Sequence, residues 1–201
     1  MSKAALISIL ILLLASTCAR AGELVGIKTS MGYLILNQEP GNYFSIEIQA
    51  PDMPAMGHFL VGKNQLQIAS TPVSDFLKDP ATLSDSRAIL EKHSESEKVY
   101  IEENVVRSPL VLKSYFENGN LYWTAKGSKI EFRVCTILHN QFVTMLNAVI
   151  LDPATAEAVS TMQKNAWATL KFRDAPWTIA EIKAFSNRYR VKHWPLELEK
   201  Y

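Results

Sequence analysis

Cysteine is scarce in this chain: its 201 residues include only Cys18 and Cys135. If the N-terminal stretch that holds Cys18 is removed, as argued below, no intrachain disulfide can form. A domain of this size does not need one, since it buries roughly 70% of the surface that its unfolded chain exposes. Asn-x-Ser/Thr glycosylation sequons are absent as well. Both absences fit a bacterial periplasmic protein better than a eukaryotic secreted one.

An excess of charge of one sign is also missing, because 21 Lys and Arg residues stand against 20 Asp and Glu. A near-neutral chain has no overall attraction for nucleic acid or for an anionic membrane, so we expect no nucleic-acid partner. Beyond the N-terminal stretch, no apolar run approaches the roughly 20 residues that cross a bilayer. We therefore expect no transmembrane segment in the mature chain.

The N-terminal stretch has the pattern of a secretory signal peptide. Lys3 supplies a positive start, residues 4–15 form an apolar run, and Ala19-Arg20-Ala21 gives the small-x-small cleavage pattern. The run is too short to span a bilayer. We predict that residues 1–21 are a signal peptide, cleaved after Ala21, and that the remaining 180 residues are periplasmic.

A second way of processing the N-terminus stays open. In that alternative Cys18 becomes the acylated first residue of a lipoprotein. Thr17 is bulkier than the residue usually found just before such a cysteine, which favours cleavage after Ala21.

The middle of the chain predicts antiparallel strands. Phe44, Ile46 and Ile48 alternate with polar residues, the period of a half-buried strand. Asn118-Gly119 favours a type I′ hairpin turn, because both positions tolerate positive φ. Pairing across that turn places Phe116 opposite Leu121. Residues 130–138 and 142–151 have apolar side chains on both faces, so we expect this pair to lie centrally in the sheet, covered on each side.

Helices are predicted over residues 84–98, 152–170 and from Thr178 onward. Asp152-Pro153 is a start signal for the second of them. Thr178-Ile179-Ala180-Glu181 matches a capping box for the third, whose apolar stripe we expect to be Ile179, Ile182, Phe185 and Tyr189.

Short antiparallel strands with helices grouped after them predict an α+β fold, in which an antiparallel sheet carries packed helices. We divide the mature chain into a single α+β domain over residues 22–172 and a C-terminal helical extension over residues 173–201. The turn-forming sequence at residues 173–176 separates the two parts.

This order of elements resembles the PsbP-like fold. Early hairpins, one middle helix, a strand meander and a last helix that ends in Trp167-Ala168-Thr169-Leu170-Lys171-Phe172 carry the resemblance, over about residues 24–172. The superfamily includes the photosystem extrinsic protein and bacterial envelope proteins of the DcrB type. The resemblance implies an α/β/α sandwich that is usually non-catalytic and acts by binding. It carries no functional residues over to this chain.

Catalytic motifs are missing from the sequence, which has no G-x-S-x-G elbow, H-E-x-x-H pair, P-loop or dinucleotide fingerprint. Cys135 and His139 are four residues apart, about 13 Å in an extended strand and too far for proton transfer. We interpret Cys135 as a buried structural thiol. The acidic residues between 91 and 103 are interleaved with lysines and indicate a solvated helix face.

One loop suggests metal binding. Met53, Met56 and His58 supply two thioethers and an imidazole within six positions, a ligand set that suits Cu(I). The Met-Pro-x-Met-Gly-His run looks like loops of some periplasmic copper-associated proteins of immunoglobulin-like fold. The alternative is a proline-rich loop whose methionines fill the end of the core.

The C-terminal extension offers a second candidate surface. It combines tryptophan and tyrosine with basic residues, a combination typical of interface hot spots. The residues we expect to contact a protein partner are Arg188, Arg190, Lys192 and Trp194. The alternative is that the helix simply docks on the domain and leaves its basic residues in solvent.

The leading hypothesis is a non-catalytic envelope protein that binds another protein or a small ligand, without a cofactor. An immunity protein that covers a toxin's active site and an accessory subunit of an envelope complex are two concrete versions. A periplasmic copper-binding protein is the alternative, and an enzyme with an unrecognised site comes third.

Overall fold

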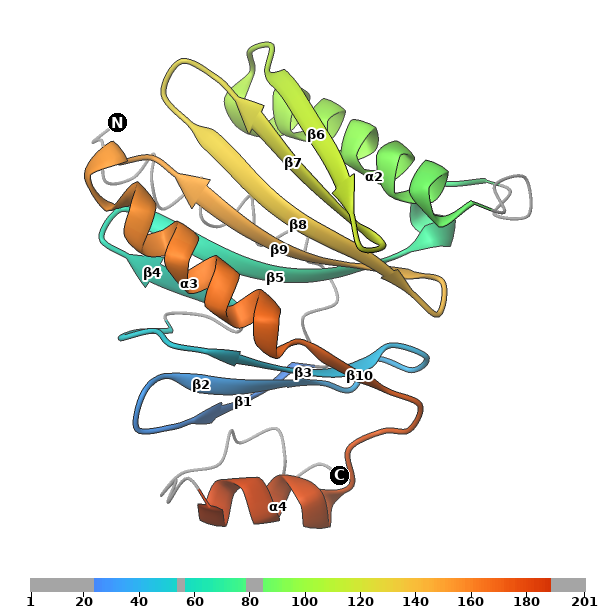
Figure 1. Cartoon of the computed structure of the whole chain (residues 1–201), viewed down its shortest axis with the longest axis vertical. Coiled ribbons are helices and arrows are strands. Elements are labelled where there is room, and N and C mark those ends of the chain that lie inside the picture. The colour runs from blue at the N-terminus through green and yellow to red at the C-terminus, as the bar shows by residue number, and fades with distance from the viewer. Residues whose placement is uncertain (1–23, 54–56, 79–84, 189–201) are drawn as a thin grey trace.

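The computed structural model describes residues 24–53, 57–78 and 85–188, and it arranges their strands in two antiparallel sheets (Figure 1). The four-stranded sheet has the order β1-β2-β3-β10. Its strands are β1 (Leu24–Lys28), β2 (Tyr33–Asn37), β3 (Tyr43–Ile48) and β10 (Lys171–Arg173). The six-stranded sheet has the order β4-β5-β9-β8-β7-β6. Its strands are β4 (His58–Val61), β5 (Asn64–Pro72), β6 (Val111–Glu117), β7 (Asn120–Lys126), β8 (Glu131–His139) and β9 (Phe142–Ile150).

The helices lie where the sequence predicted them. They are α2 (Ser86–Tyr100), which continues as a π-helical turn over Ile101–Val106, α3 (Ala156–Thr169) and α4 (Ile179–Arg188). Short 3₁₀ turns cover Val73–Asp75 and Pro153–Thr155. The α+β class is confirmed. The sequence pattern did not separate the strands into two sheets, because both sheets alternate in the same way.

The elements stack in layers (Figure 1). The helix α2 packs on one face of the six-stranded sheet, where Ile89 and Leu90 join a core with Trp123 and Phe132. The helix α3 and the four-stranded sheet share a second core with the opposite face of the six-stranded sheet. The helix α4 lies against the far side of the four-stranded sheet through Ile182. The six-stranded sheet is therefore covered on both faces, as expected for its central strands.

The strand register could be predicted from the sequence for one of the two long hairpins and not for the other. Asn118 and Gly119 adopt φ of 50° and 79°, and Phe116 pairs with Leu121 as predicted. The last hairpin uses the same kind of turn, with φ of 44° at Asn140 and 65° at Gln141. That turn pairs His139 with Phe142 and sets a register that the sequence left open.

The packing face of α4 corrects one prediction. Ile182 is buried, as expected, and Phe185 is half-buried. Ile179 is 42% exposed, so its place in the docking stripe was wrong. Trp177, just before the helix, packs into this cluster instead and lies edge-on to the ring of Phe185 at 5.4 Å. Tyr189 lies outside the described residues.

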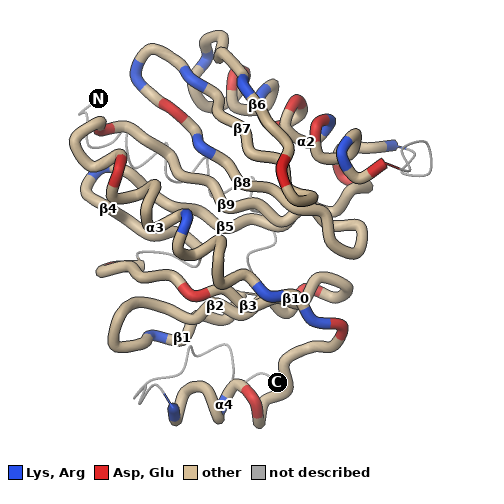
Figure 2. The backbone as a smooth tube through the Cα atoms, viewed as in Figure 1, with Lys and Arg blue, Asp and Glu red and all other residues tan. Residues whose placement is uncertain are grey.

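Charge is spread evenly over the fold. Basic and acidic residues are interspersed along the backbone (Figure 2), in line with the near-neutral composition. Among the described residues, no helix is both long and apolar enough to cross a membrane. The predicted division between residues 172 and 173 falls inside β10 and stays a prediction.

Candidate functional site

A single row of residues across the six-stranded sheet brings several polar side chains into the interior. His58 on β4 lies opposite Gln67 on β5, and Gln67 lies opposite Asn147 on β9. Asn147 is paired with Val134, which is paired with Trp123. Residues directly opposite each other on neighbouring strands project to the same face of a sheet. The five side chains therefore share one face, and we call His58, Gln67 and Asn147 the polar row.

The polar row is on the same face as α2 but toward the other end of the sheet. Met145 and Val149, which flank Asn147 at the period of a strand, belong to the core that contains α2. The contacts of α2 are chiefly with β7 and β8. The helix α3 covers β5 and β9 on the opposite face. Over the residues that the structure describes, the β4–β5 end of this face therefore has no helix of its own.

The polar row is buried and incompletely hydrogen-bonded. His58 and Asn147 are each 5% exposed, and Gln67 is 3% exposed. Asn147 Nδ2 donates to Gln67 Oε1 at 3.3 Å. Each of the three side chains of the polar row has one polar atom without a hydrogen-bond partner among the described residues: His58 Nδ1, Gln67 Nε2 and Asn147 Oδ1. A buried polar atom without a partner costs about 1–3 kcal/mol, so a water or a ligand that completed these hydrogen bonds would stabilise this face.

The chemistry of the polar row is that of neutral groups. Burial lowers the pKa of His58 below its ordinary value, against a smaller opposing effect of a hydrogen bond with Gln65. The ring is therefore neutral near pH 7, with one nitrogen that donates and one that accepts. Exchanging the oxygen and nitrogen of both amides would still leave one free donor and one free acceptor. The row is therefore complementary to an uncharged ligand that carries a hydrogen-bond donor beside an acceptor.

The residues predicted to bind copper are separated by the sheet. Met53 packs against the core between the two sheets, whereas His58 projects to the α2 side through its pairing with Gln67. Met56 lies outside the described residues. Of the described chain, no group of three or more His, Cys, Asp and Glu residues could hold a metal ion.

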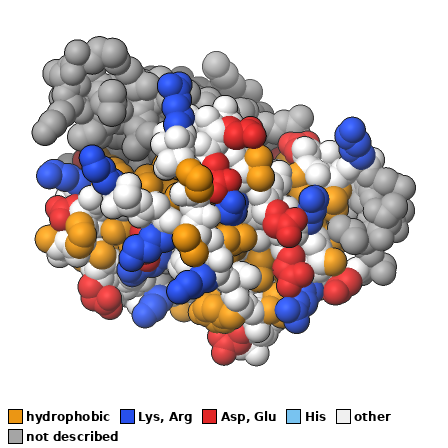
Figure 3. Space-filling view, turned by 90° about the horizontal axis from the view of Figure 1, so that it is seen from above, with side chains coloured by type: hydrophobic (Ala, Val, Ile, Leu, Met, Phe, Trp, Pro, Cys, Tyr) orange, Lys and Arg blue, Asp and Glu red, His pale blue; other side chains and the backbone are white. Residues whose placement is uncertain are grey.

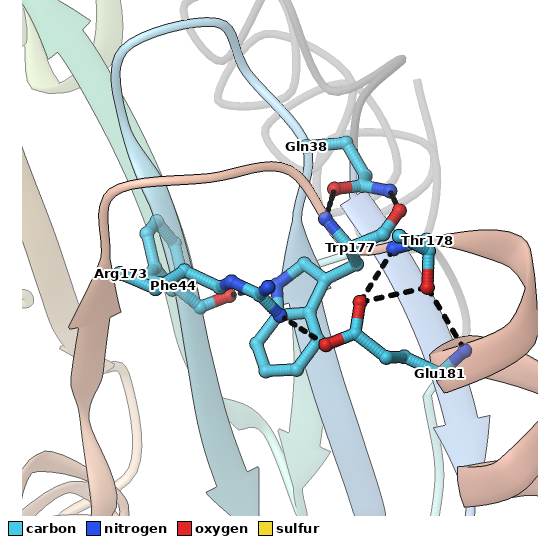
Figure 4. A network of polar contacts seen from close by, with 6 residues as sticks. All are labelled: Gln38, Phe44, Arg173, Trp177, Thr178 and Glu181. Carbon is cyan, nitrogen blue, oxygen red and sulfur yellow. Dashed lines mark hydrogen bonds and ion pairs between the residues drawn. The ribbon is translucent and has the colours of Figure 1, made fainter.

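The residues predicted to bind a protein partner are only partly described. Arg188 is exposed as the last residue of α4, and Arg190, Lys192 and Trp194 lie outside the described residues. The start of α4 is fixed to the four-stranded sheet (Figure 4). Trp177 Nε1 donates to the carbonyl of Phe44 at 3.3 Å, and the Arg173 guanidinium lies 4.1 Å from the centre of the Trp177 ring.

The capping box at the start of α4 forms as predicted. The Glu181 carboxylate accepts from the Thr178 backbone N–H at 2.7 Å, and Glu181 N–H donates to Thr178 Oγ1 at 3.2 Å. Glu181 also accepts from Arg173 at 3.1 Å. Thr178 and Glu181 are thus engaged in the helix cap and in the contact with Arg173, whereas Ile179 between them is exposed.

Cys135 and the acidic residues of α2 and the π-helical turn after it, the other candidates for chemistry, are held in contacts within the fold. Cys135 is buried, and burial raises the pKa of its thiol to about 12, which leaves almost no thiolate at pH 7. Glu91 pairs with Arg87 at 2.8 Å. Glu102 accepts from Lys98 at 2.7 Å and from the backbone of Leu110 at 2.6 Å. The burial of Cys135 agrees with its interpretation as a structural thiol. The prediction of a solvated acidic face holds for Glu91 but was wrong for Glu97 and Glu102, whose side chains are 24% and 20% exposed.

Sequence reasoning missed Gln67 and Asn147. Asn147 is an amide residue inside the mostly apolar β9, which is the one signal the sequence contains, whereas Gln67 lies among other polar residues of β5. Their juxtaposition depends on the pairing of β5 with β9, two strands whose amides are 80 positions apart.

Comparison with known proteins gives two findings, and no curated protein matches the sequence. The solution structure of cyanobacterial PsbP (CyanoP) from Synechocystis sp. PCC 6803 is similar at 10% identity, covering 68% of this chain and 89% of that chain, with a TM-score of 0.37. The order of elements suggested a resemblance to this fold, and so low a score carries no further argument. The family model described as "2'-5'-oligoadenylate synthetase 1, domain 2, C-terminus" matches residues 89–199.

The matched stretch runs from α2 through the strands β6–β9, α3 and β10 to α4 and beyond. It leaves out β4 and β5, so the polar row lies only partly within it. The description names one domain of a synthetase, and no activity follows from that name for this chain. Because the match spans more than half of the 201 residues, the chain belongs to the family of this C-terminal domain.

Proposed function

We propose that the mature chain is a non-catalytic binding protein of the cell envelope and that the polar row receives an uncharged ligand. The observation that carries the proposal is the set of three buried polar atoms without partners on neighbouring strands. The ligand class follows from the chemistry of the row, since a group with an adjacent donor and acceptor, such as an amide or a pair of hydroxyls, would complete its hydrogen bonds. The row holds no formal charge to select an ion.

A buried water is the competing explanation, because such waters typically make about three hydrogen bonds to otherwise unpaired groups. Side-chain amide NMR signals of the mature protein distinguish the two. We expect the Gln67 and Asn147 signals to shift on titration with N-acetylglucosamine, its dimer or a blocked dipeptide amide. The signals of Gln163, on the opposite face, serve as the control. If none of these probes moves the two signals, the row is a hydrated structural feature.

Protein binding is the second version of the proposed function. Its support is the exposure of Arg188 at the end of a helix whose other end is fixed to the domain. A pull-down from envelope extract compares the native mature chain with an Arg188→Ala/Arg190→Ala/Trp194→Ala variant, with Lys192 left in place. Loss of a specific co-purifying protein at unchanged melting temperature would support an immunity or accessory role. Retention of every specific partner would make the segment structural.

Periplasmic location rests on the signal-peptide pattern. Intact-mass measurement of the envelope fraction should give a chain that begins at Gly22. An acylated chain that begins at Cys18 would instead place the protein on a membrane leaflet.

Copper binding is the alternative function, and the unpartnered His58 Nδ1 is the observation in its favour. We expect weak binding or none, because Met53 packs against the core on the other side of the sheet. Competition with a chromophoric Cu(I) chelator tests this on the native chain and a Met53→Leu/Met56→Leu/His58→Ala variant. Tight binding by the native chain that the variant loses would promote copper handling.

A further inference from the structure

The strand β6 ends the six-stranded sheet and leaves an open edge. Among the described elements, its one neighbour in the sheet is β7. Val111 is 63% exposed and Tyr115 is 61% exposed, values that are high for large apolar side chains in a strand. Viewed from above, hydrophobic side chains reach the surface between charged ones on this side of the molecule (Figure 3). Such an edge is a template for pairing with another strand.

The hairpin turn determines which backbone groups of β6 are free. Glu117 and Asn120 flank a two-residue turn, so they exchange hydrogen bonds with each other. Hydrogen-bonded pairs alternate along an antiparallel ladder, and Tyr115 and Lys113 therefore also bond toward β7. Leu112, Ser114 and Phe116 direct their N–H and C=O groups away from the sheet.

We propose that two copies of this chain pair through β6, antiparallel, about a two-fold axis at Tyr115. This register places Ser114 opposite Phe116 of the partner subunit, so outward-facing backbone groups meet each other. It also places Lys113 opposite Glu117 of the partner subunit, and the two-fold axis creates this opposite-charge pair twice. Opposite charges that face each other across a strand pair stabilise it. The inference is independent of the proposed ligand site.

The aromatic contacts support the same register. Tyr115 and Tyr122 already stack, with ring centroids 5.0 Å apart and planes 14° from parallel. Pairing about Tyr115 extends this stack into a ladder of four tyrosines across the axis. Other symmetric registers also bring the free backbone groups together, but they pair the charges less well. A two-fold axis at Ser114 leaves both charges without an opposite partner, and one at Lys113 places two lysines face to face.

Charge reversal tests the pairing in the mature protein by sedimentation equilibrium. We expect a dimer for the native chain. Lys113→Glu or Glu117→Lys alone should raise the dissociation constant at least about tenfold, because each change creates two like-charge pairs. The double variant should restore the dimer. Lys126→Glu, a reversal on the exposed face of β7, should leave the dimer intact. A monomeric native chain, or a double variant that fails to recover, would overturn the proposal.

Cysteine cross-linking tests the register. In a non-hydrogen-bonded pair the two Cα atoms are about 4.5 Å apart, within the range that a disulfide spans. Tyr115→Cys should therefore form a covalent dimer on mild oxidation, and Ser114→Cys, which faces Phe116 of the partner subunit, should not. Both variants carry Cys135→Ser, because Cys135 lies in the same row of the sheet as Tyr122 and Tyr115. Equal cross-linking of both variants, or none of Tyr115→Cys, would refute pairing about Tyr115.

Discussion

The side-chain amide of Gln38 pairs with both backbone groups of Trp177. Gln38 Nε2 donates to the Trp177 carbonyl at 2.7 Å, and Trp177 N–H donates to Gln38 Oε1 at 2.8 Å. Gln38 follows β2, and Trp177 precedes α4, so the amide fastens the C-terminal helix to the four-stranded sheet. Because both polar groups of the Gln38 side chain take part, the contact holds the start of α4 against the four-stranded sheet.

Two isoleucines on α4 should differ in their contribution to stability. Ile182→Ala should lower the free energy of unfolding by about 2–4 kcal/mol, because it leaves a cavity beside Leu34 and Leu36. Ile179→Ala should cost less than about 1 kcal/mol, since that side chain is 42% exposed. Urea denaturation of the two variants measures the difference. Equal losses would mean that α4 docks through a different face.

The error at Ile179 shows what periodicity leaves undetermined. The spacing of apolar residues on a helix predicts which side chains share a face. A large side chain just outside the helix can still take the packing position expected for the first of them. Trp177 fills that role here, and its position became apparent only from its packing with Phe185. The hairpin at Asn118-Gly119 was predictable in register, because a two-residue turn fixes which residues face each other.

The polar row could not be predicted because its members come from strands that are distant in sequence. Gln67 and Asn147 meet through the pairing of β5 with β9. That pairing depends on which apolar residues share a core, a property of the whole domain. The sequence singled out His58 for a different reason, its proximity to two methionines, and so assigned it to a different kind of site.

Two buried amide sites should respond differently to replacement by leucine. Gln163 Nε2 donates to the carbonyls of Arg133 and Leu146 at 2.7 and 2.8 Å. Gln163→Leu should therefore lower the free energy of unfolding by about 1–3 kcal/mol. Gln67→Leu/Asn147→Leu removes the hydrogen bond between the two amides together with both unpaired atoms, and it should be neutral or stabilising. Thermal melts compare the two variants. A large loss for the double variant would show that the two amides are satisfied in solution.

The thiol of Cys135 should be inert in the folded protein. Burial raises its pKa to about 12, and the thiolate is the reactive form. Mass spectrometry after incubation with iodoacetamide at pH 8 should show no alkylation of the mature native chain and full alkylation in denaturant. Rapid alkylation of the folded chain would instead indicate an accessible, activated thiol and reopen the enzyme hypothesis.

The buried His93 and the half-buried Glu97 on α2 should make stability depend on pH in two opposing ways. Burial lowers the pKa of His93 to about 4 and raises that of Glu97 to about 7. His93 therefore destabilises the fold as pH falls from about 6.5 toward 4, because the unfolded chain takes up the proton more readily. Glu97 acts oppositely, since its ionisation costs stability as pH rises from about 4.5 through 7.

Replacing Glu97 should leave the pH dependence of stability that His93 causes on its own. His93 Nε2 and Glu97 Oε1 are 3.8 Å apart, and neither ring nitrogen of His93 has a hydrogen-bond partner among the described residues. In Glu97→Gln only the histidine effect remains, so the urea midpoint should fall more between pH 7 and pH 5 than in the native chain. Glu95→Gln, which alters an exposed carboxylate on the same helix, should follow the native profile. A Glu97→Gln profile parallel to that of the native chain would mean that Glu97 is already ionised at pH 5 in the folded protein.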